Sequence, residues 1–190
     1  MGNPKLRTLQ KQHPKFFRAV AADARVTLAY RAEEFEINRL RLAAQIIRLS
    51  WVSDAFLAQV FYRAKARLQY FRIPIIPTVL HRLSMIHSQV CIGAPVVIDP
   101  GIYLAHGQVV IDGFTKISSG VVIFPWVTVG LKAGNHQGPT IGRHVHIGTG
   151  AKVLGPVTIG EGSVIGANAV ATRDVAPHQT VVGIPAEVLQ

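Results

Sequence analysis

The chain has 190 residues, of which 49% are hydrophobic and 16% are charged, and its formal net charge is +10. This composition argues against a disordered chain, and the length suits one domain or one domain with an appendage. A single cysteine, Cys91, excludes an internal disulfide framework and fits a reducing cytoplasm, where we expect the protein to work. The basic opening segment has no apolar core, and no run of about 18 uncharged apolar residues follows, so we expect neither a signal peptide nor a membrane span.

Charge and glycine content divide the chain near residue 89. Residues 1–89 hold 15 Lys and Arg against 5 Asp and Glu, whereas residues 90–190 hold 5 of each. Gly2 is the single one of the 17 glycines in the first part. We therefore predict an α+β chain, with a basic helical N-terminal region at 1–89 and a second domain at 90–190.

The N-terminal region has a helical composition. Residues 15–72 contain neither Gly nor Pro and are rich in Ala, Leu, Arg and Glu. The expected helices, with a short one leading into the second domain, are 15–32, 36–49, 53–72 and 78–87. Ser53 or Asp54 is expected to cap the third helix.

The third helix has an apolar stripe that we expect to face a core, opposite Arg63, Lys65 and Arg67. The stripe consists of Phe56, Leu57, Val60, Phe61, Ala64, Leu68 and Phe71. No nucleic-acid-binding motif accompanies the arginines, so we expect no nucleic acid partner. The helices are expected to pack on the second domain or on a neighbouring subunit, and peripheral contact with a membrane surface is the alternative.

From Val90 onward a branched aliphatic residue recurs every six positions. One phase contains Ile92, Ile98, Leu104 and Val110. A second phase, one residue later, contains Ile111, Ile117, Ile123 and Val129, and the period continues with Ile141, Ile147, Val153, Ile159 and Ile165. Gly follows the repeating residue at 93, 130, 142, 148, 160 and 166. Neither a helix nor an ordinary sheet places Gly at a fixed phase of six, so the pattern predicts a parallel β-helix of hexapeptide repeats. A plain scaffold is one interpretation of such a fold.

The strings VHIGTGAKVLGPVTIGEGSVIGANAV and TVVGIPAEV, together with QVVIDG, WVTVG and PTIG, resemble the catalytic domain of the serine O-acetyltransferases, which are hexapeptide-repeat acyltransferases. The resemblance covers about the last hundred residues. It implies a left-handed parallel β-helix closed by a C-terminal cap, a homotrimer, and acetyl-CoA as the acyl donor in the cleft between neighbouring solenoids. The helical region is shorter than is typical of that family, so a dimer of trimers is not implied.

His106, in the string YLAHGQVVID, is the candidate catalytic residue. Attack of a hydroxyl on a thioester requires proton removal, for which His is well suited near neutral pH. In the similar family the base occupies this position. We therefore expect direct O-acetyl transfer with His106 as general base, and backbone N–H groups near Gly130 and Thr149 stabilising the oxyanion.

The resemblance also places a row of small residues along the acetyl-CoA cleft. These residues are Gly130, Gly148, Thr149, Gly166 and Ala167, with Lys132 and Lys152 as partners for the CoA phosphates. His144 and His146 are expected to lie on the surface, and we expect no metal site.

The acceptor is where this sequence departs from the similar family. The Asp before the catalytic His is Ala105 here, and the Asp that orients the imidazole is Cys91, with Asp99 or Asp112 as substitutes. In the loop LKAGNHQGPT, the two acceptor-holding positions are Gln137 and Gly138, neither of them charged. His136, Gln137 and Arg143 are the expected acceptor-binding residues. Serine is the acceptor that the resemblance implies; a sugar, a secondary metabolite hydroxyl or a non-catalytic trimeric scaffold are the alternatives.

Overall fold

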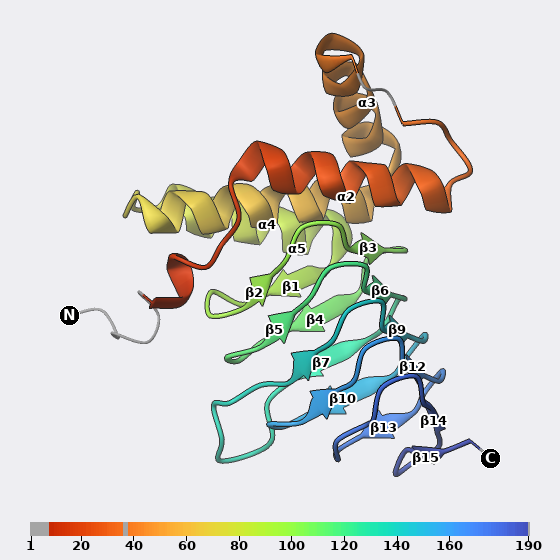
Figure 1. Ribbon diagram of the computed structural model, residues 1–190. Helices are drawn as coiled ribbons and strands as arrows, with labels where there is room; N and C mark the ends of the chain where they lie inside the picture. The colour runs from red at the N-terminus through yellow and green to blue at the C-terminus, as the bar shows by residue number, and fades with distance from the viewer. Residues whose placement is uncertain (1–7, 36–37, 190) are drawn as a thin grey trace.

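The computed structural model describes residues 8–35 and 38–189, in which helices α2 to α5 precede strands β1 to β15. Residues 1–7, 36–37 and 190 of the ranges predicted above lie outside the described residues. The helices gather over one end of a β-solenoid, and β15 lies at its other end (Figure 1). None of the helices in the described part has the length and apolar character needed to cross a bilayer.

The helices follow the predicted pattern. Their bounds are α2 Phe16–Tyr30, α3 Arg39–Val52, α4 Asp54–Tyr70 and α5 Ile76–Ser88. Ser53 is the N-cap of α4, because its Oγ accepts a hydrogen bond from the N–H of Phe56 at 3.3 Å. Pro77 lies in the first turn of α5, where a proline is tolerated because its missing N–H has no helical partner.

The solenoid has three strands in each turn, and equivalent strands of successive turns pair in parallel as three sheets. The first sheet contains β1 Val90–Ile92, β4 Val109–Ile111, β7 Thr128–Gly130, β10 Lys152–Leu154 and β13 Val170–Ala171. The second contains β2 Val97–Ile98, β5 Lys116–Ile117, β8 Thr140–Ile141 and β11 Thr158–Ile159. The third contains β3 Tyr103–Leu104, β6 Val122–Ile123, β9 His146–Ile147, β12 Val164–Ile165, β14 Thr180–Val182 and β15 Glu187–Val188. β15 pairs antiparallel with β14 and so closes the far end.

The six-residue period predicts the core of this solenoid, with one correction. Ile111 is fully buried, whereas Val110 is 40% exposed and is not a core residue. Cys91 pairs with Val110 and Val110 with Thr128, so the first turn is one residue longer than the second. The turn before β4 accommodates the extra residue, with Gln108 at a φ of 57°. The two phases in the sequence are therefore one buried row interrupted by a single inserted residue.

The predicted apolar stripe of α4 is partly correct, because Phe56 is buried in a second apolar cluster, but the face opposite the stripe is buried too. Arg63 and Lys65, expected on the polar face, are buried, whereas Phe71 is 55% exposed. Ala55, Ala58 and Tyr62 pack into the solenoid core instead. The opposite face of α4 contacts the second cluster, which consists of Val20, Ala24, Leu28, Leu49 and Phe56.

The reason for this orientation is the open end of the solenoid. Carbonyls of the first turn have no preceding turn to pair with, and a buried carbonyl without a partner is costly. Side chains of α4 donate to them: Gln59 to Ile102, Tyr62 to Val96, Arg63 to Ile98 and Asp99, and Lys65 to Ile92. The polar residues of α4 thus end the sheet ladder.

Asp23 of α2 completes this layer. Its carboxylate accepts hydrogen bonds from Arg63, at 2.8 and 3.1 Å, and from the N–H groups of Gly101 and Ile102. Both side chains of the Asp23–Arg63 pair are almost fully buried. The pair links α2, α4 and the first solenoid turn.

Candidate active site

The candidate residues lie on three different edges of the solenoid. The third–first edge, between each third-sheet strand and the next first-sheet strand, holds His106, Gly148, Thr149, Gly166 and Ala167. The first–second edge, where first-sheet strands end, holds Gly130, Lys132, His136 and Gln137. The second–third edge holds Arg143. One chain alone therefore does not bring the predicted base and the predicted acceptor loop together.

His106 lies in the elongated turn between β3 and β4, and its side chain is exposed. The C-terminal end of α5 holds this turn, because the N–H of Gln108 donates to the carbonyl of Ser88 at 3.0 Å. A Cβ at Gly107 would lie 1.9 Å from that same oxygen, so only glycine allows this approach. The helical region thus fixes the backbone on which the candidate base is carried.

The groups proposed to orient His106 are not next to it. Asp112 follows β4 at the first–second edge, and Asp99 follows β2 at the second–third edge. Burial, together with the Asp112 carboxylate, raises the pKa of the Cys91 thiol despite the opposing effect of Lys65. A neutral thiol cannot stabilise an imidazolium as a carboxylate does. Within the described residues, no carboxylate is hydrogen-bonded to the His106 ring.

Different physical constraints account for the glycines predicted to line the donor site. A Cβ at Gly148 would lie 2.7 Å from the backbone nitrogen of Ala167, and one at Gly166 would lie 2.7 Å from a side-chain carbon of Val182. Stacking of successive turns therefore accounts for both. A Cβ at Gly130 would meet nothing within 4 Å, and its φ is not in the left-handed region. Packing within the chain does not explain Gly130.

The two candidate lysines lie at opposite ends of first-sheet strands. Lys152 begins β10, and its Nζ donates to the carbonyls of Trp126 at 2.7 Å and Gly150 at 2.9 Å. This pairing holds two turns of the third–first edge together and gives Lys152 a structural role. Lys132 is exposed at the first–second edge, beside Gly155.

The loop between β7 and β8 projects from the solenoid (Figure 1). His136 and Gln137 are both exposed in it. The Asn135 side chain accepts from the N–H of Gln137 at 2.8 Å, and the Gln137 Nε2 donates to the carbonyl of Phe114 at 3.5 Å. Arg143, beyond β8, is separated from this loop by the second sheet.

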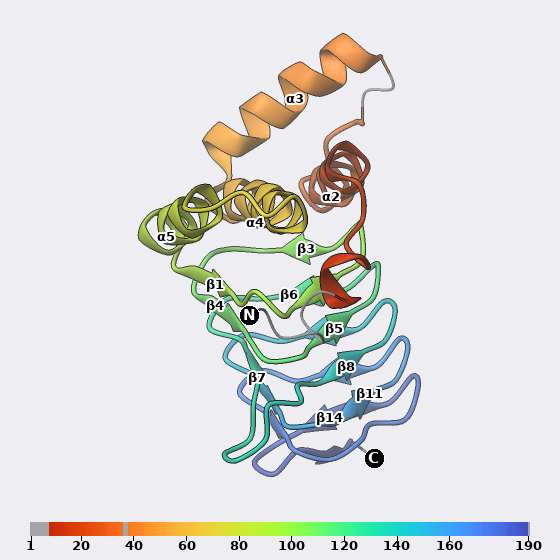
Figure 2. The same ribbon diagram turned by 90° about the vertical axis from the view of Figure 1, so that its left-hand side faces the viewer.

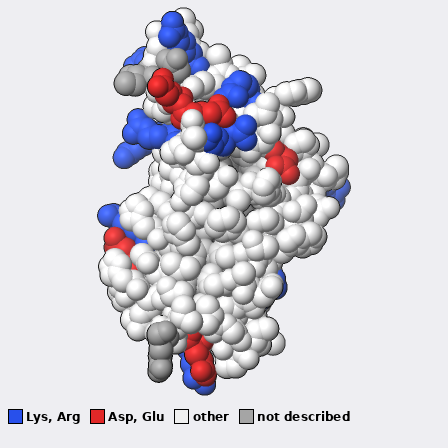
Figure 3. Space-filling view, turned by 90° about the vertical axis from the view of Figure 1, so that its right-hand side faces the viewer, with Lys and Arg blue, Asp and Glu red and all other residues white. Residues whose placement is uncertain are grey.

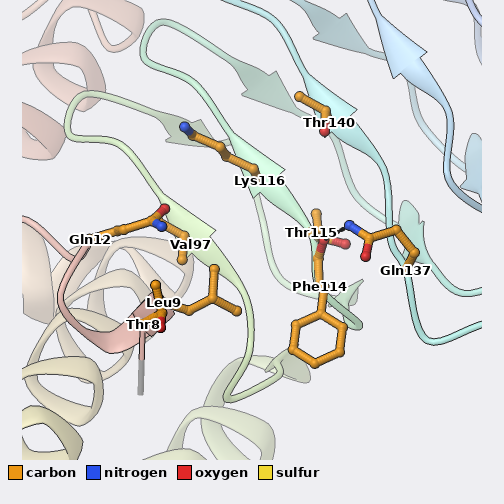
Figure 4. Close-up of a pocket in the computed structure, with 9 residues that line it drawn as sticks. All are labelled: Thr8, Leu9, Gln12, Val97, Phe114, Thr115, Lys116, Gln137 and Thr140. Atoms are coloured by element: carbon orange, nitrogen blue, oxygen red, sulfur yellow. Dashed lines mark hydrogen bonds between the residues drawn. The ribbon is translucent and has the colours of Figure 1, made fainter. Parts of the chain in front are cut away.

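A pocket of about 510 Å³ lies beside this loop, against the second sheet. Its lining consists of Thr8, Leu9, Gln12, Val97, Phe114, Thr115, Lys116, Gln137 and Thr140. Gln137 and Phe114 lie close together at one side of it, and Leu9 faces Val97 at another (Figure 4). Of the predicted acceptor residues, only Gln137 lines this pocket.

Two aromatic residues at the third–first edge were not predicted to belong to the site. Phe124 and Trp126 are 36% and 60% exposed, in the turn after β6. This turn lies between the turn of His106 and that of Gly148. The signal was present in the string IFPWVTVG, because large apolar residues at an outward phase have no use inside a single solenoid.

Two further histidines of the solenoid lie on its surface. His144 and His146 are exposed, as predicted. Across residues 8–35 and 38–189, no group of three or more His, Cys, Asp or Glu side chains is arranged to hold a metal ion.

Comparison with known proteins gives consistent results for sequence and fold. Residues 138–173 match the family described as bacterial transferase hexapeptide (six repeats). The serine acetyltransferase of Synechococcus elongatus is 39% identical over 137 residues, which are 70% of this chain and 56% of that protein. The chain thus spans about half the length of curated relatives that it matches.

Solved structures agree over nearly the whole chain. A serine acetyltransferase in complex with CoA is 25% identical with a TM-score of 0.77, covering 96% of this chain and 72% of that one. The soybean serine acetyltransferase complexed with serine is 30% identical with a TM-score of 0.77, covering 94% of this chain and 71% of that one. The chain therefore belongs to the serine acetyltransferase-like family of hexapeptide-repeat transferases.

Proposed function

We propose that this protein is an acetyl-CoA-dependent O-acetyltransferase that transfers the acetyl group directly to a small hydroxyl acceptor. The observation that carries the proposal is the exposed His106 on the same edge as Gly148, Thr149, Gly166 and Ala167, in a chain of this family. Structures of family members complexed with CoA and with serine support the two substrate classes.

In this proposal the His106 imidazole accepts the proton of the acceptor hydroxyl while that oxygen attacks the thioester carbonyl. The tetrahedral intermediate then collapses, the C–S bond breaks, and the imidazolium returns the proton to the CoA sulfur. The products are the O-acetyl ester and CoA, and no other reactant is consumed. The exposure of His106 supports this role, because an acceptor can reach the ring directly.

Acetyl-CoA is proposed to lie along the third–first edge. Neighbouring turns are about 4.8 Å apart, so the row from His106 to Gly166, three turns away, is about 14 Å long. Phe124 and Trp126 lie along this row and supply an apolar surface for the pantetheine arm. Such a row suits an extended ligand that is held mainly by backbone groups.

The complete site is proposed to form between copies in a homotrimer. The third–first edge of one copy would face the first–second edge of the next, which brings Gly130, Lys132 and the β7–β8 loop opposite His106. The open space at Gly130 supports this arrangement, because a ligand or neighbouring chain can approach there. Closed threefold symmetry gives three equal sites.

Serine is the acceptor class that the family favours, and a less charged hydroxyl is the second candidate. The observation that favours the second is the absence of charge at Ala105, Gln137 and Gly138. A buried amino-acid carboxylate without a cationic partner is bound poorly. A sugar or secondary metabolite hydroxyl carries no such requirement.

The test is CoA release followed with a thiol reagent, with serine, homoserine, simple sugars or no acceptor. We expect one hydroxyl acceptor to stimulate release, and His106→Ala to reduce turnover by about 10²–10⁴-fold while calorimetric CoA binding is retained. Turnover of His106→Ala within about tenfold of wild type would remove His106 from the role of base. Failure of every acceptor to stimulate release would favour the scaffold interpretation.

A further inference from the structure

Helix α3 exposes an apolar face that nothing in the described chain covers. It extends away from the layer of α2, α4 and α5, on the side opposite the solenoid (Figure 2). Leu49 is its one fully buried residue. Leu40, Ile47 and Trp51 are 82%, 71% and 90% exposed, although each would gain from burial.

These three side chains form one stripe. They lie at positions i, i+7 and i+11 of a regular helix, and therefore project in nearly the same direction. The arginines of α3, namely Arg39, Arg41 and Arg48, lie to either side of the stripe at this spacing. The helix contains no acidic residue.

We propose that α3 lies on an anionic lipid surface, with Leu40, Ile47 and Trp51 inserted at the headgroup level. A helix with an apolar stripe, an interfacial Trp and flanking arginines has the properties of an interfacial amphipathic helix. The head of Arg39, beside the stripe, can remain among anionic headgroups while its apolar stem covers the edge of the stripe.

The flanking charge distinguishes this occupant from a second copy of α3. Two such helices packed through their stripes would bring arginines next to arginines. Glu33, an acidic neighbour, is paired with both Arg31 and Arg48, so these three side chains together keep a net charge of +1. An anionic surface complements this charge, whereas a second copy does not.

The charge distribution of the whole chain also favours an orientation in which the helical end faces the anionic surface. Residues 1–89 carry the entire net charge of +10, and residues 90–190 are neutral overall. Figure 3 shows most basic side chains of this face at the helical end, with acidic side chains among them, and a solenoid face with few charges. A bilayer at α3 would leave the solenoid extending into water, so this proposal does not depend on the proposed transferase activity.

The experiment is co-sedimentation of the full chain with phosphatidylcholine vesicles that contain or lack about one third phosphatidylserine. Binding is expected to anionic vesicles and to weaken as salt rises, because each basic residue near such a surface contributes up to about fivefold in affinity. In a Trp126→Phe background, Trp51 is the remaining one of the two tryptophans, and its fluorescence is expected to shift to shorter wavelength on binding.

The matched variants are Leu40→Ser with Ile47→Ser and Trp51→Ser, against Leu189→Ser, an exposed leucine at the far end of the solenoid. The triple variant is expected to bind anionic vesicles at least about tenfold more weakly, with circular dichroism and CoA affinity unchanged, and Leu189→Ser to bind as wild type. Equal binding by the triple variant and wild type would overturn the proposal. So would a lower molar mass of the triple variant in light scattering, which would assign the stripe to a second copy.

Discussion

The backbone polar groups of the solenoid are satisfied in different ways along its length and at the end that the helical region covers. Each solenoid turn pairs with the next, and buried aliphatic residues repeat from turn to turn, as Ile98 and Ile117 do in paired strands. The helical region covers the end of the solenoid where the first turn has no preceding turn to pair with. Its contacts with the solenoid therefore combine apolar packing with hydrogen bonds to the open carbonyls, donated by residues such as Tyr62 and Arg63.

Charged side chains are buried where the helical region meets the solenoid, whereas none of the described charged residues is buried inside the solenoid itself. Inside the solenoid, neighbouring turns satisfy the carbonyls, and an apolar core suffices. At the open end, the carbonyls require donors that reach out from a helix, and long cationic side chains provide them. Arg63 also neutralises Asp23, which holds α2 in place.

The largest effect is expected from breaking this polar layer. Arg63→Met leaves the buried Asp23 carboxylate without its cation, and the free energy of unfolding should fall by about 3–5 kcal/mol. Arg67→Met, on the same helix but stacked on Tyr70 and Phe71, should cost less than about 1 kcal/mol. Urea denaturation measures both, and equal losses would show that the buried pair is not what joins the regions.

Substitution of the solenoid glycines should have a smaller effect, and it distinguishes glycines required for packing from those required for CoA binding. Gly148→Ala places a methyl group against the backbone of Ala167 and should destabilise the fold by about 1–3 kcal/mol. Gly130→Ala has open space and should leave stability unchanged but weaken CoA binding in calorimetry. Unchanged CoA affinity in Gly130→Ala would remove that position from the donor site.

The acceptor loop should respond with a change of selectivity rather than of stability. Gln137→Arg supplies the cation that an amino-acid carboxylate requires, so the ratio of kcat/KM for serine to that for an uncharged hydroxyl acceptor should rise about tenfold, equivalent to about 1.4 kcal/mol. Gln12→Arg, which lines the same pocket from the N-terminal side, is the matched control. Equal shifts in both variants would indicate a general charge effect.

A further effect, expected only at acid pH, concerns the helical region. Burial, with added repulsion from Arg63 and Lys65, lowers the pKa of His13 from 6.5 to about 4. Because the unfolded chain binds this proton at a higher pH than the folded one, stability should decline as pH falls from about 6.5 to about 4. His13→Leu should flatten this decline in thermal unfolding, since both ring nitrogens lack a hydrogen-bond partner among the described residues. An unaltered pH profile would contradict this origin.

The sequence predicts the solenoid better than the helical region because the repeat is a local rule. The six-residue period identifies the buried row. It misassigns Val110, because one inserted residue moves the buried position to Ile111 although Val110 is also aliphatic. Helix positions and the cap at Ser53 also follow from local signals. The burial of Arg63 and Lys65 does not, because helical amphipathicity assigns charge to solvent and cannot detect unpaired carbonyls elsewhere in the chain.

The candidate site shows the same limit. His106 and the small residues of its edge are identified by resemblance, and the structure places them in one row. Linear sequence does not reveal that His136 and Gln137 lie on another edge, since that depends on how three sheets close around the axis. The outward phase of Trp126 can be inferred from the repeat, but its position between the turns of His106 and Gly148 follows only from the stacked turns.

The central claim is that each active site combines the His106 edge of one copy with the Gly130 edge of the next. Its most direct test mixes two inactive variants, His106→Ala and Gly130→Trp, by co-refolding at equal ratio and measuring acetyl-CoA-dependent CoA release. Random trimers should regain about a quarter of wild-type activity, because about one interface in four pairs an intact edge with an intact edge. Absence of activity in the mixture, with trimers confirmed by light scattering, would contradict a shared site.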